Sequence, residues 1–512
     1  MADFPAARSR AIALDEQIVQ AAAAVSPEYA DLVSLAARQA MAGIEITLPP
    51  PADGSWNMSD VKAFMKDVGN TQRVNPTETI FAALPALMYL NASITGALLE
   101  PLLECQSSSG YTNSFAASDL GANYPTALGE FSSSPVFAVE DSGNMLILVW
   151  AHARSSGDGS LIGRYYTLLK EWADYLSTHA LTLEQQSPAD SREDSLGQTQ
   201  TNITNLALKG IIAVRAMAEI SRAKGEAEDA LRYETTSKTL AQSWMNLTLS
   251  AGQLHWTYDE SASYGLMYNL FPDKLLQLDL FPSTVYEAES ASLSNHSTSL
   301  PPFGFPLSSD SSNTRSDWTL FSAAAAPDVA TRDRLISTVH ASASMNSTEG
   351  IFPNLYNVET GAGPGAGIYP NGYASPAQGA LFSLLALNVP NKTVVIPPRM
   401  TPPRTVRKNT AAIVGGVMGT LGLMLLVAAA TMFIRRRQRR RTIEHNMAAP
   451  QPYEAVPNMA QSSGEPSPSR KRSPPNPSQV TTAGDGLRGE VVRLRQDLEE
   501  LRAIHEAPPV YE

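Results

Sequence analysis

Apolar residues recur at three- and four-residue spacing through much of residues 1–388, which is the period of a helix with one buried face. The pattern is clearest in three stretches, Ser160–Ser177, Asn202–Ile220 and Ala227–Leu249. Shorter stretches with the same spacing are Ala11–Ala24, Ala30–Met41, Thr77–Leu90, Arg332–His340 and Gln378–Leu387. Alternating strand patterns are few. The sequence therefore predicts an all-α domain of about a dozen helices.

Segments rich in Gly, Asn, Ser and Pro separate the predicted helices. They are Gly110–Asn123, Asp259–Tyr264, Asn295–Thr314 and Pro353–Pro376. Binding and catalytic residues often lie in loops that a rigid frame positions. We therefore expect a functional site to be built mainly from these loops.

A second region of the chain has the pattern of a membrane anchor. Ala411–Ile434 is an uncharged run of 24 residues, long enough as a helix to cross a bilayer core. Arg435–Arg441 follows with six arginines in seven residues. Positive charge collects on the cytoplasmic side of membrane proteins. The sequence predicts a transmembrane helix at 411–434, reached by a Pro/Thr stalk at 389–410, with the C-terminus in the cytoplasm.

Glycosylation sequons indicate the same topology. All seven N-x-S/T acceptors precede the predicted membrane helix: Asn57, Asn91, Asn202, Asn246, Asn295, Asn346 and Asn391. This distribution is typical of an extracellular or luminal N-terminal part. Residues 1–30 lack the apolar core of a signal peptide. We therefore expect the native N-terminus to be missing from this chain, although unconventional export is the alternative.

The predicted cytoplasmic tail has three parts. Residues 435–486 are basic and rich in Pro and Ser, which is typical of disorder. Residues 487–506 carry a short heptad pattern, and Pro508–Tyr511 has the P-P-x-Y form of a WW-domain ligand. Within the membrane helix, Gly415 and Gly419 form a G-x-x-x-G motif that can support a homodimer. A lipid bilayer, a WW-domain protein and a second copy are thus the expected partners.

Composition excludes several classes of protein. A net charge of −12 and a pI near 5.2 argue against nucleic-acid binding. The chain has one cysteine, Cys105, so a disulfide framework, a zinc–thiolate site and an iron–sulfur cluster are excluded. The histidines before the membrane show no ligand spacing. We expect neither a metal nor a cofactor.

Candidate chemistry is confined to carboxylates in Gly- and Asn-rich surroundings. Asp119, the pair Glu140-Asp141, and Asp317 followed by Trp318 are the clearest examples. Separated carboxylates suit hydrolysis by a general acid and a general base. The alternative role for each of them is to cap a helix.

Many collinear motifs resemble the fungal glutaminase A family. They include YADLVSLAARQA (29–40), SDLGANYPTALG (118–129), VEDSGNMLIL (139–148), TNLALKGIIAVRAM (204–217), RSDWTLFSAA (315–324) and SPAQGALFSLLAL (375–387). The resemblance covers roughly residues 5–388 and implies a six-hairpin (α/α) toroid that hydrolyses the amide of L-glutamine. It also implies a β-rich domain before the toroid, which we expect to be missing from this chain together with the native N-terminus.

On this resemblance the catalytic candidates are Glu140, foremost, with Asp119 and Asp141. Substrate-binding candidates are Asp317, Trp318, Asn205 and Asp194. Replacing Glu140 with glutamine is expected to abolish hydrolysis while leaving thermal stability nearly unchanged.

Several family positions are altered in this chain. Ser118 stands where the family has His, and Asp141 replaces the second residue of a Glu-Glu pair. Glu193-Asp194-Ser195 replaces Asp-Asp-Phe. Loss of polar groups from a site can reduce activity by orders of magnitude. Three functions therefore remain open: a membrane-anchored glutaminase-like hydrolase, a six-hairpin glycoside hydrolase acting on a glycan, and a non-catalytic surface receptor.

Overall fold

The computed structural model describes residues 3–49, 60–67, 72–129, 134–188, 201–250, 252–296, 301–345, 352–363 and 374–398. All of them belong to the first of two structural units, Met1–Arg404. The predicted transmembrane helix, most of the stalk, the cytoplasmic heptads and the P-P-x-Y motif lie outside the described residues, as do Asn57, Asp194 and Asn346.

The described residues are mostly helical, as predicted. Their α-helices are α1 (Phe4–Ala23), α2 (Pro27–Ala42), α3 (Thr77–Gln106), α4 (Ala138–Ser156), α5 (Ser160–His179), α6 (Thr204–Lys224), α7 (Ala227–Thr248), α8 (Phe271–Leu275), α9 (Ser283–Asn295), α10 (Ser316–Ala325), α11 (Val329–Ala343) and α12 (Ser383–Ala386). Short 3-10 helices include η1 (Pro135–Phe137), η3 (Tyr268–Leu270) and η5 (Pro376–Phe382).

Three small antiparallel sheets correct the all-α prediction. Each has two strands: β1 (Ile44–Thr47) with β2 (Lys62–Met65), β3 (Leu249–Ser250) with β4 (Gln253–Leu254), and β5 (Asn313–Arg315) with β6 (Leu355–Asn357). Strands of two to four residues are too short for an alternating pattern to identify. The last sheet matters for function, because β5 leads directly into the first turn of α10.

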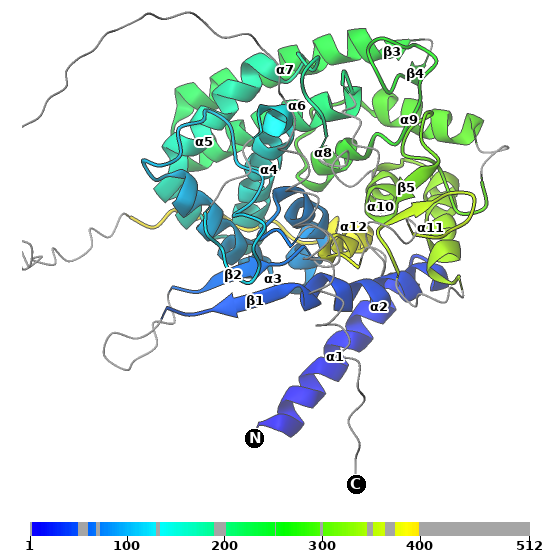
Figure 1. Ribbon diagram of the computed structural model, residues 1–512, viewed down its shortest axis with the longest axis horizontal. Coiled ribbons are helices and arrows are strands. Elements are labelled where there is room, and N and C mark those ends of the chain that lie inside the picture. Colours follow the sequence, from blue (N-terminus) through cyan, green and yellow to red (C-terminus); the bar gives the residue numbers. More distant parts are fainter. Residues whose placement is uncertain are drawn as a thin grey trace, which may run out of the picture. The chain divides into compact units, whose positions relative to one another are not determined.

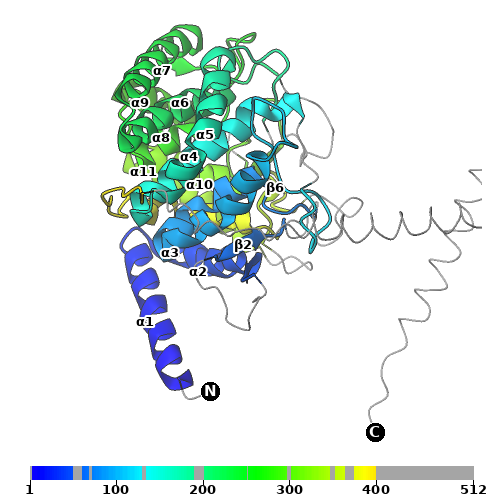
Figure 2. The same cartoon turned by 90° about the vertical axis from the view of Figure 1, so that its left-hand side faces the viewer.

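Six segments form an inner ring in which each contacts the next. In order they are α3, α4, α6, η3, α10 and η5, and η5 contacts α3 to close the circle. Helices α2, α5, α7, α9 and α11 lie around this ring (Figure 1). Helix α1 packs on α2 and buries only Ile18 and Ala22, so most of its length extends away from the remaining helices (Figure 2).

Two inner-ring helices have no solvent-exposed face, which explains why periodicity does not predict them. Every residue of α10 is buried, and α4 is buried without interruption from Ala138 to Val149. A helix covered on all sides shows no 3.6-residue alternation. Gly143 of α4 marks close packing rather than a loop, because a Cβ there would lie 2.7 Å from Cγ of Lys209 on α6.

Helix α3 is apolar enough to resemble a membrane span but belongs to the core. Among the described residues it passes the length and composition test for a spanning helix, yet 61% of its most apolar window is buried inside the protein. Its backbone is also interrupted at Asn91 (φ −163°, ψ 97°). We conclude that α3 is a core helix of the inner ring.

The first residues of the predicted stalk lie against the helical domain. The N–H of Lys392 donates to the carbonyl of Arg154 (2.7 Å), and the N–H of Val395 donates to that of Gly157 (2.9 Å). Ile396 fills the space beside Gly159, because a Cβ on Gly159 would lie 2.6 Å from Cγ1 of Ile396. We call residues 391–396 the strap, because they follow the turn between α4 and α5.

Candidate functional site

The first turns of the inner-ring segments meet at one end of the ring. Three hydrogen bonds join neighbouring first turns: Thr77 Oγ1 to Asp141 Oδ1 (3.0 Å), Asn269 N–H to Asn205 Oδ1 (3.1 Å) and Ser316 Oγ to Gln378 Oε1 (2.8 Å). The N-termini of α3, α4, α6 and α10 therefore face a common region. Helix N-termini favour negative charge, and three of these helices carry carboxylates in their first turns.

Glu140 and Lys209 form a buried ion pair between α4 and α6. The Lys209 ammonium contacts Glu140 Oε1, and the two side chains are 0% and 1% exposed, respectively. Asn144, one turn further along α4, donates an Nδ2 hydrogen bond to the same oxygen at 3.3 Å. A charge-assisted contact of this kind favours the ionised carboxylate. Glu140 is therefore held as an anion.

Aromatic rings surround the Lys209 ammonium. Its Nζ lies 4.1 Å from the ring centre of Phe81 and 5.7 Å from that of Trp318. Trp318 in turn stacks on Tyr268, with ring centroids 4.4 Å apart and planes 6° from parallel. Cation–π contacts of this kind stabilise a desolvated ammonium. Trp318, a predicted substrate-binding residue, is thus buried beside the Lys209 ammonium.

Arg315 and Asp317 form a second buried pair at the start of α10. Arg315 Nε donates to Asp317 Oδ1 at 3.0 Å, and Nη2 donates to Oδ2 at 2.6 Å. This is the bidentate geometry that orients a guanidinium and a carboxylate most firmly. The guanidinium carbon also lies 5.0 Å from the Trp318 ring centre. Trp318 therefore borders both buried cations, Lys209 and Arg315.

A third cation, Arg73, gathers three carboxylates beside α3. It contacts Glu78, and its Nη2 and Nη1 lie 3.3 Å from Asp67 and 3.6 Å from Asp119. Burial opposes the charged guanidinium, but Glu78, Asp67 and Asp119 together raise the pKa of Arg73 well above its usual value. Asp119 is further fixed by the N–H of Gly121 at 2.9 Å. Asp119 is therefore better placed to orient Arg73 than to act on a substrate.

Asp141 is bound by hydroxyl groups. It accepts from Thr77 Oγ1 on one oxygen and from Ser118 Oγ on the other. Ser118 and Asp141 are two of the positions where the chain departs from the family pattern, and they touch each other. In this chain a hydrogen bond therefore joins the two altered positions.

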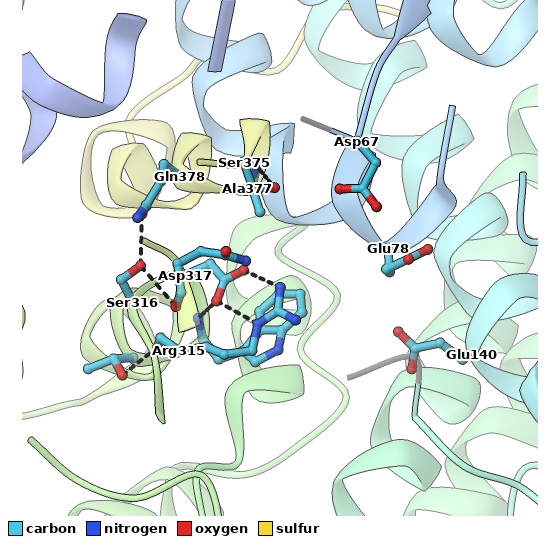
Figure 3. Close-up of polar contacts among 12 residues, drawn as sticks. Asp67, Glu78, Glu140, Arg315, Ser316, Asp317, Ser375, Ala377 and Gln378 are labelled. Carbon is cyan, nitrogen blue, oxygen red and sulfur yellow. Dashed lines mark hydrogen bonds and ion pairs between the residues drawn. The ribbon is translucent and has the colours of Figure 1, made fainter. Parts of the chain in front are cut away.

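Five of the predicted residues thus lie in first turns that meet at one end of the inner ring. They are Glu140 and Asp141 on α4, Asn205 on α6, and Asp317 and Trp318 on α10. Figure 3 shows Glu140 with Asp67 and Glu78 on one side of the view, and Arg315, Asp317 and Gln378 on the other. The expectation of a loop-built site is wrong for Glu140, Asp141 and Asp317, which are helical. Asp119 does lie in the loop between α3 and α4.

Sequence reasoning missed the three cations and two of the acids, Asp67 and Glu78. Lys209 is a lone charge within the run Asn205–Val214, and Glu78 is the one charged residue between Arg73 and Glu100. A single charge in a fully buried helix is rare unless it is paired, so both could have been selected on that ground. Arg73 and Arg315 carry no comparable signal. Within the described residues no group of His, Cys, Asp and Glu has the arrangement of a metal site.

The chain matches the family profile of the glutaminase A six helical-hairpin domain over residues 26–385. This match covers most of the chain, and the chain therefore belongs to the glutaminase A family. The family identified by resemblance is confirmed, as is a mostly helical fold with a six-hairpin domain.

Two curated fungal relatives support this assignment. Glutaminase A of Aspergillus oryzae is 32% identical over 391 residues, which cover 75% of this chain and 54% of the relative. A probable glutaminase of Arthroderma benhamiae is 26% identical over 465 residues, which cover 74% and 51%, respectively. The chain thus spans about half the length of these relatives.

Solved structures give weaker likenesses. A metal-independent α-mannosidase from Streptococcus pneumoniae aligns with a TM-score of 0.47 and 14% identity, over 72% of this chain and 96% of that one. A family GH76 α-mannanase from Bacteroides thetaiotaomicron aligns with a TM-score of 0.38 and 11% identity, over 70% and 95%. Neither likeness bears on what this chain does.

Proposed function

We propose that this chain is a hydrolase of the glutaminase A type, acting on the side-chain amide of L-glutamine, and that its inner ring closes as a six-hairpin (α/α) toroid. Family membership supports the reaction class. The observation that carries the assignment of residues is the Glu140–Lys209 pair, which holds a carboxylate as an anion where the first turns of the inner ring meet.

Glu140 is the proposed general base. It takes a proton from a water molecule, the water oxygen bonds to the amide carbon, and the carbon–nitrogen bond then breaks. The leaving nitrogen needs a proton to depart as ammonia. Asp141 accepts hydroxyl hydrogen bonds on both oxygens, which favours its ionised form. Glu140 is therefore also the proposed proton donor, and it returns to the leaving nitrogen the proton that it took from the water. Lys209 keeps Glu140 ionised but also weakens it as a base, so the strength of this contact tunes the reaction.

The test is ammonia release from L-glutamine by the purified full-length chain and its variants. Glu140→Gln should lower kcat by at least about a hundredfold, the usual scale for a lost acid or base. The structure changes one earlier expectation: this variant leaves Lys209 buried without its carboxylate, so stability should fall. The double variant Glu140→Gln/Lys209→Met removes both buried charges. If it is folded but inactive, activity is lost because the base is missing and not because the protein unfolds.

Glu234→Gln is the matched control, because Glu234 lies on the outer helix α7 and its side chain is 27% exposed. It should retain full activity. A folded wild-type chain that releases no ammonia would refute the glutaminase assignment. Sugar release from aryl glycosides by the same preparation would favour a glycoside hydrolase. Inactivity on both substrate classes would favour a binding protein.

We also propose that the domain is anchored by a single membrane helix at 411–434, with the domain outside and the tail in the cytoplasm. The uncharged run, the arginines after it and the distribution of sequons support this topology. Of the sequons in the described residues, Asn91, Asn246, Asn295 and Asn391 are exposed. Glycosidase-sensitive mass and protection of the domain from protease in sealed vesicles would support the topology. Protease protection of the tail instead would reverse it.

A further inference from the structure

A second polar recess lies away from the first turns of the inner ring. It encloses about 370 Å³ and lies between the β1–β2 hairpin, the second half of α3 and the start of α5. We call it the outer cavity, and its lining includes Ile94, His152, Asp158, Leu161 and Arg164. None of the candidate catalytic residues lines it. Its volume lies in the range of small-molecule sites.

His152 is the buried polar group of the outer cavity. It is 3% exposed, and its Nδ1 lies 3.0 Å from the carbonyl oxygen of Ala92. A carbonyl can only accept, so Nδ1 carries the hydrogen, and Nε2 of the neutral ring is an acceptor. Burial lowers the pKa of His152 despite the opposing effects of the Ala92 carbonyl and of Asp158. The ring is therefore neutral at pH 7.

Nε2 of His152 lies opposite a second acceptor. Asp158 Oδ2 is 3.9 Å away, and Asp158 Oδ1 is fixed by the N–H of Ser160 at 2.8 Å. A neutral Nε2 and a carboxylate oxygen have no hydrogen to share at this distance. A group with several N–H donors placed beside both atoms can satisfy them together.

The charges on the cavity wall favour a cation. Glu100 and Asp158 are acidic, whereas Arg164 is the basic group that faces them. Arg164 forms an ion pair with Glu100, to which its Nη1 donates a hydrogen bond at 2.6 Å. The excess is thus one negative charge, located at Asp158. Apolar side chains, among them Ile94 and Leu161, form much of the remaining wall, which also includes Asn91, Ser93 and Ser160.

We propose that the outer cavity binds a small primary amine with an apolar body, whose ammonium lies between His152 Nε2 and Asp158. The apolar body packs against Ile94 and Leu161. This site is separate from the proposed glutaminase chemistry and does not depend on it.

The test is calorimetric titration of the full-length chain with n-hexylammonium at pH 7.5. N-glycans are removed first, because Asn91, a predicted acceptor, lines the same cavity. The probe should bind, and 1-hexanol, which has the same body without the charge, should bind at least about tenfold more weakly. Binding should also weaken once the pH falls below the pKa of His152, which burial lowers, because a protonated His152 turns Nε2 into a donor.

Two variants test the geometry. Asp158→Asn and His152→Phe should each weaken binding by about tenfold or more, on the scale of one lost charged hydrogen bond. The side chain of Asp158 is 54% exposed, so Asp158→Asn keeps the test usable if His152→Phe unfolds the chain. The matched controls are His340→Phe and Asp31→Asn, which alter a surface His–Asp pair (3.1 Å) and should leave binding unchanged. Equal binding of hexanol and hexylammonium, full affinity in Asp158→Asn, or no heat of binding at millimolar probe would each overturn the proposal.

Discussion

Replacing Lys209 with methionine removes one charge from a pair that has almost no access to water. The side chains of Lys209 and Glu140 are 0% and 1% exposed. Methionine keeps much of the length and apolar volume of lysine, so the main change is a buried carboxylate left without its ammonium. Removing one partner of a buried pair costs about 3–5 kcal/mol. We expect the free energy of unfolding at pH 7 to fall by that amount.

The assay is urea unfolding of the full-length chain, followed by tryptophan fluorescence, at pH 7 and pH 5. The loss should be smaller at pH 5, because protonation of Glu140 removes the charge that has lost its ammonium. Lys238→Met is the control. Lys238 is 65% exposed and pairs with Glu234 one turn away on α7. An exposed pair of this kind contributes about 0.3–0.5 kcal/mol.

The double variant Lys209→Met/Glu140→Gln completes the cycle. The double variant replaces a buried ion pair with uncharged groups of similar volume. Such a replacement often changes the free energy of unfolding very little. The double variant should therefore be more stable than Lys209→Met alone. The reasoning fails if Lys209→Met costs less than about 1 kcal/mol, or if adding Glu140→Gln restores nothing.

Two further predictions concern other parts of the chain. Burial raises the pKa of Glu289 on α9 to about 8, against the opposing hydrogen bond from the Met267 N–H. Between the ordinary carboxyl pKa and pH 8, Glu289 is protonated in the folded protein but ionised in the unfolded chain. Its contribution to stability therefore falls as pH rises through that range. Glu289→Gln should flatten the melting temperature between pH 5 and pH 8 in a thermal scan, and an unchanged slope would contradict the argument. In the tail, Tyr511→Ala should abolish capture by a purified WW domain, whereas equal capture of both tails would exclude Pro508–Tyr511 as its ligand.

Four of the five outer helices could be predicted from the sequence, because one face of each touches water, whereas α9 (Ser283–Asn295) was not predicted. The predicted helix Ser160–Ser177 is α5 (Ser160–His179), and Ala227–Leu249 is α7 (Ala227–Thr248). The inner helices α4 and α10 could not, since uninterrupted burial leaves no alternation to detect. In α4, Gly143 and Asn144 resemble loop residues, although one permits close helix packing and the other binds Glu140.

Four acids of the candidate site, Asp119, Glu140, Asp141 and Asp317, could be selected from the sequence, but which residue each one pairs with could not. Glu140 and Lys209 are 69 positions apart, and Ser118 and Asp141 are 23 apart. No local pattern links such pairs, because the closure of the ring brings them together. The pair Arg315–Asp317 is different, because its members are only two positions apart and meet locally at the start of α10.

Ring closure also determines when the domain can complete its folding during synthesis. The circle is completed by α3 and η5, which pack so closely that a Cβ on Gly379 would lie 2.8 Å from the Cα of Ala83. About 270 residues separate the end of α3 from the start of η5. At 5–20 residues per second, a ribosome therefore synthesises η5 roughly 15–50 s after α3. For that interval the nascent chain exposes the face of α3 that η5 will cover. Because α3 matches a membrane span in length and composition, we expect the unfinished ring to depend on chaperones until its last hairpin emerges.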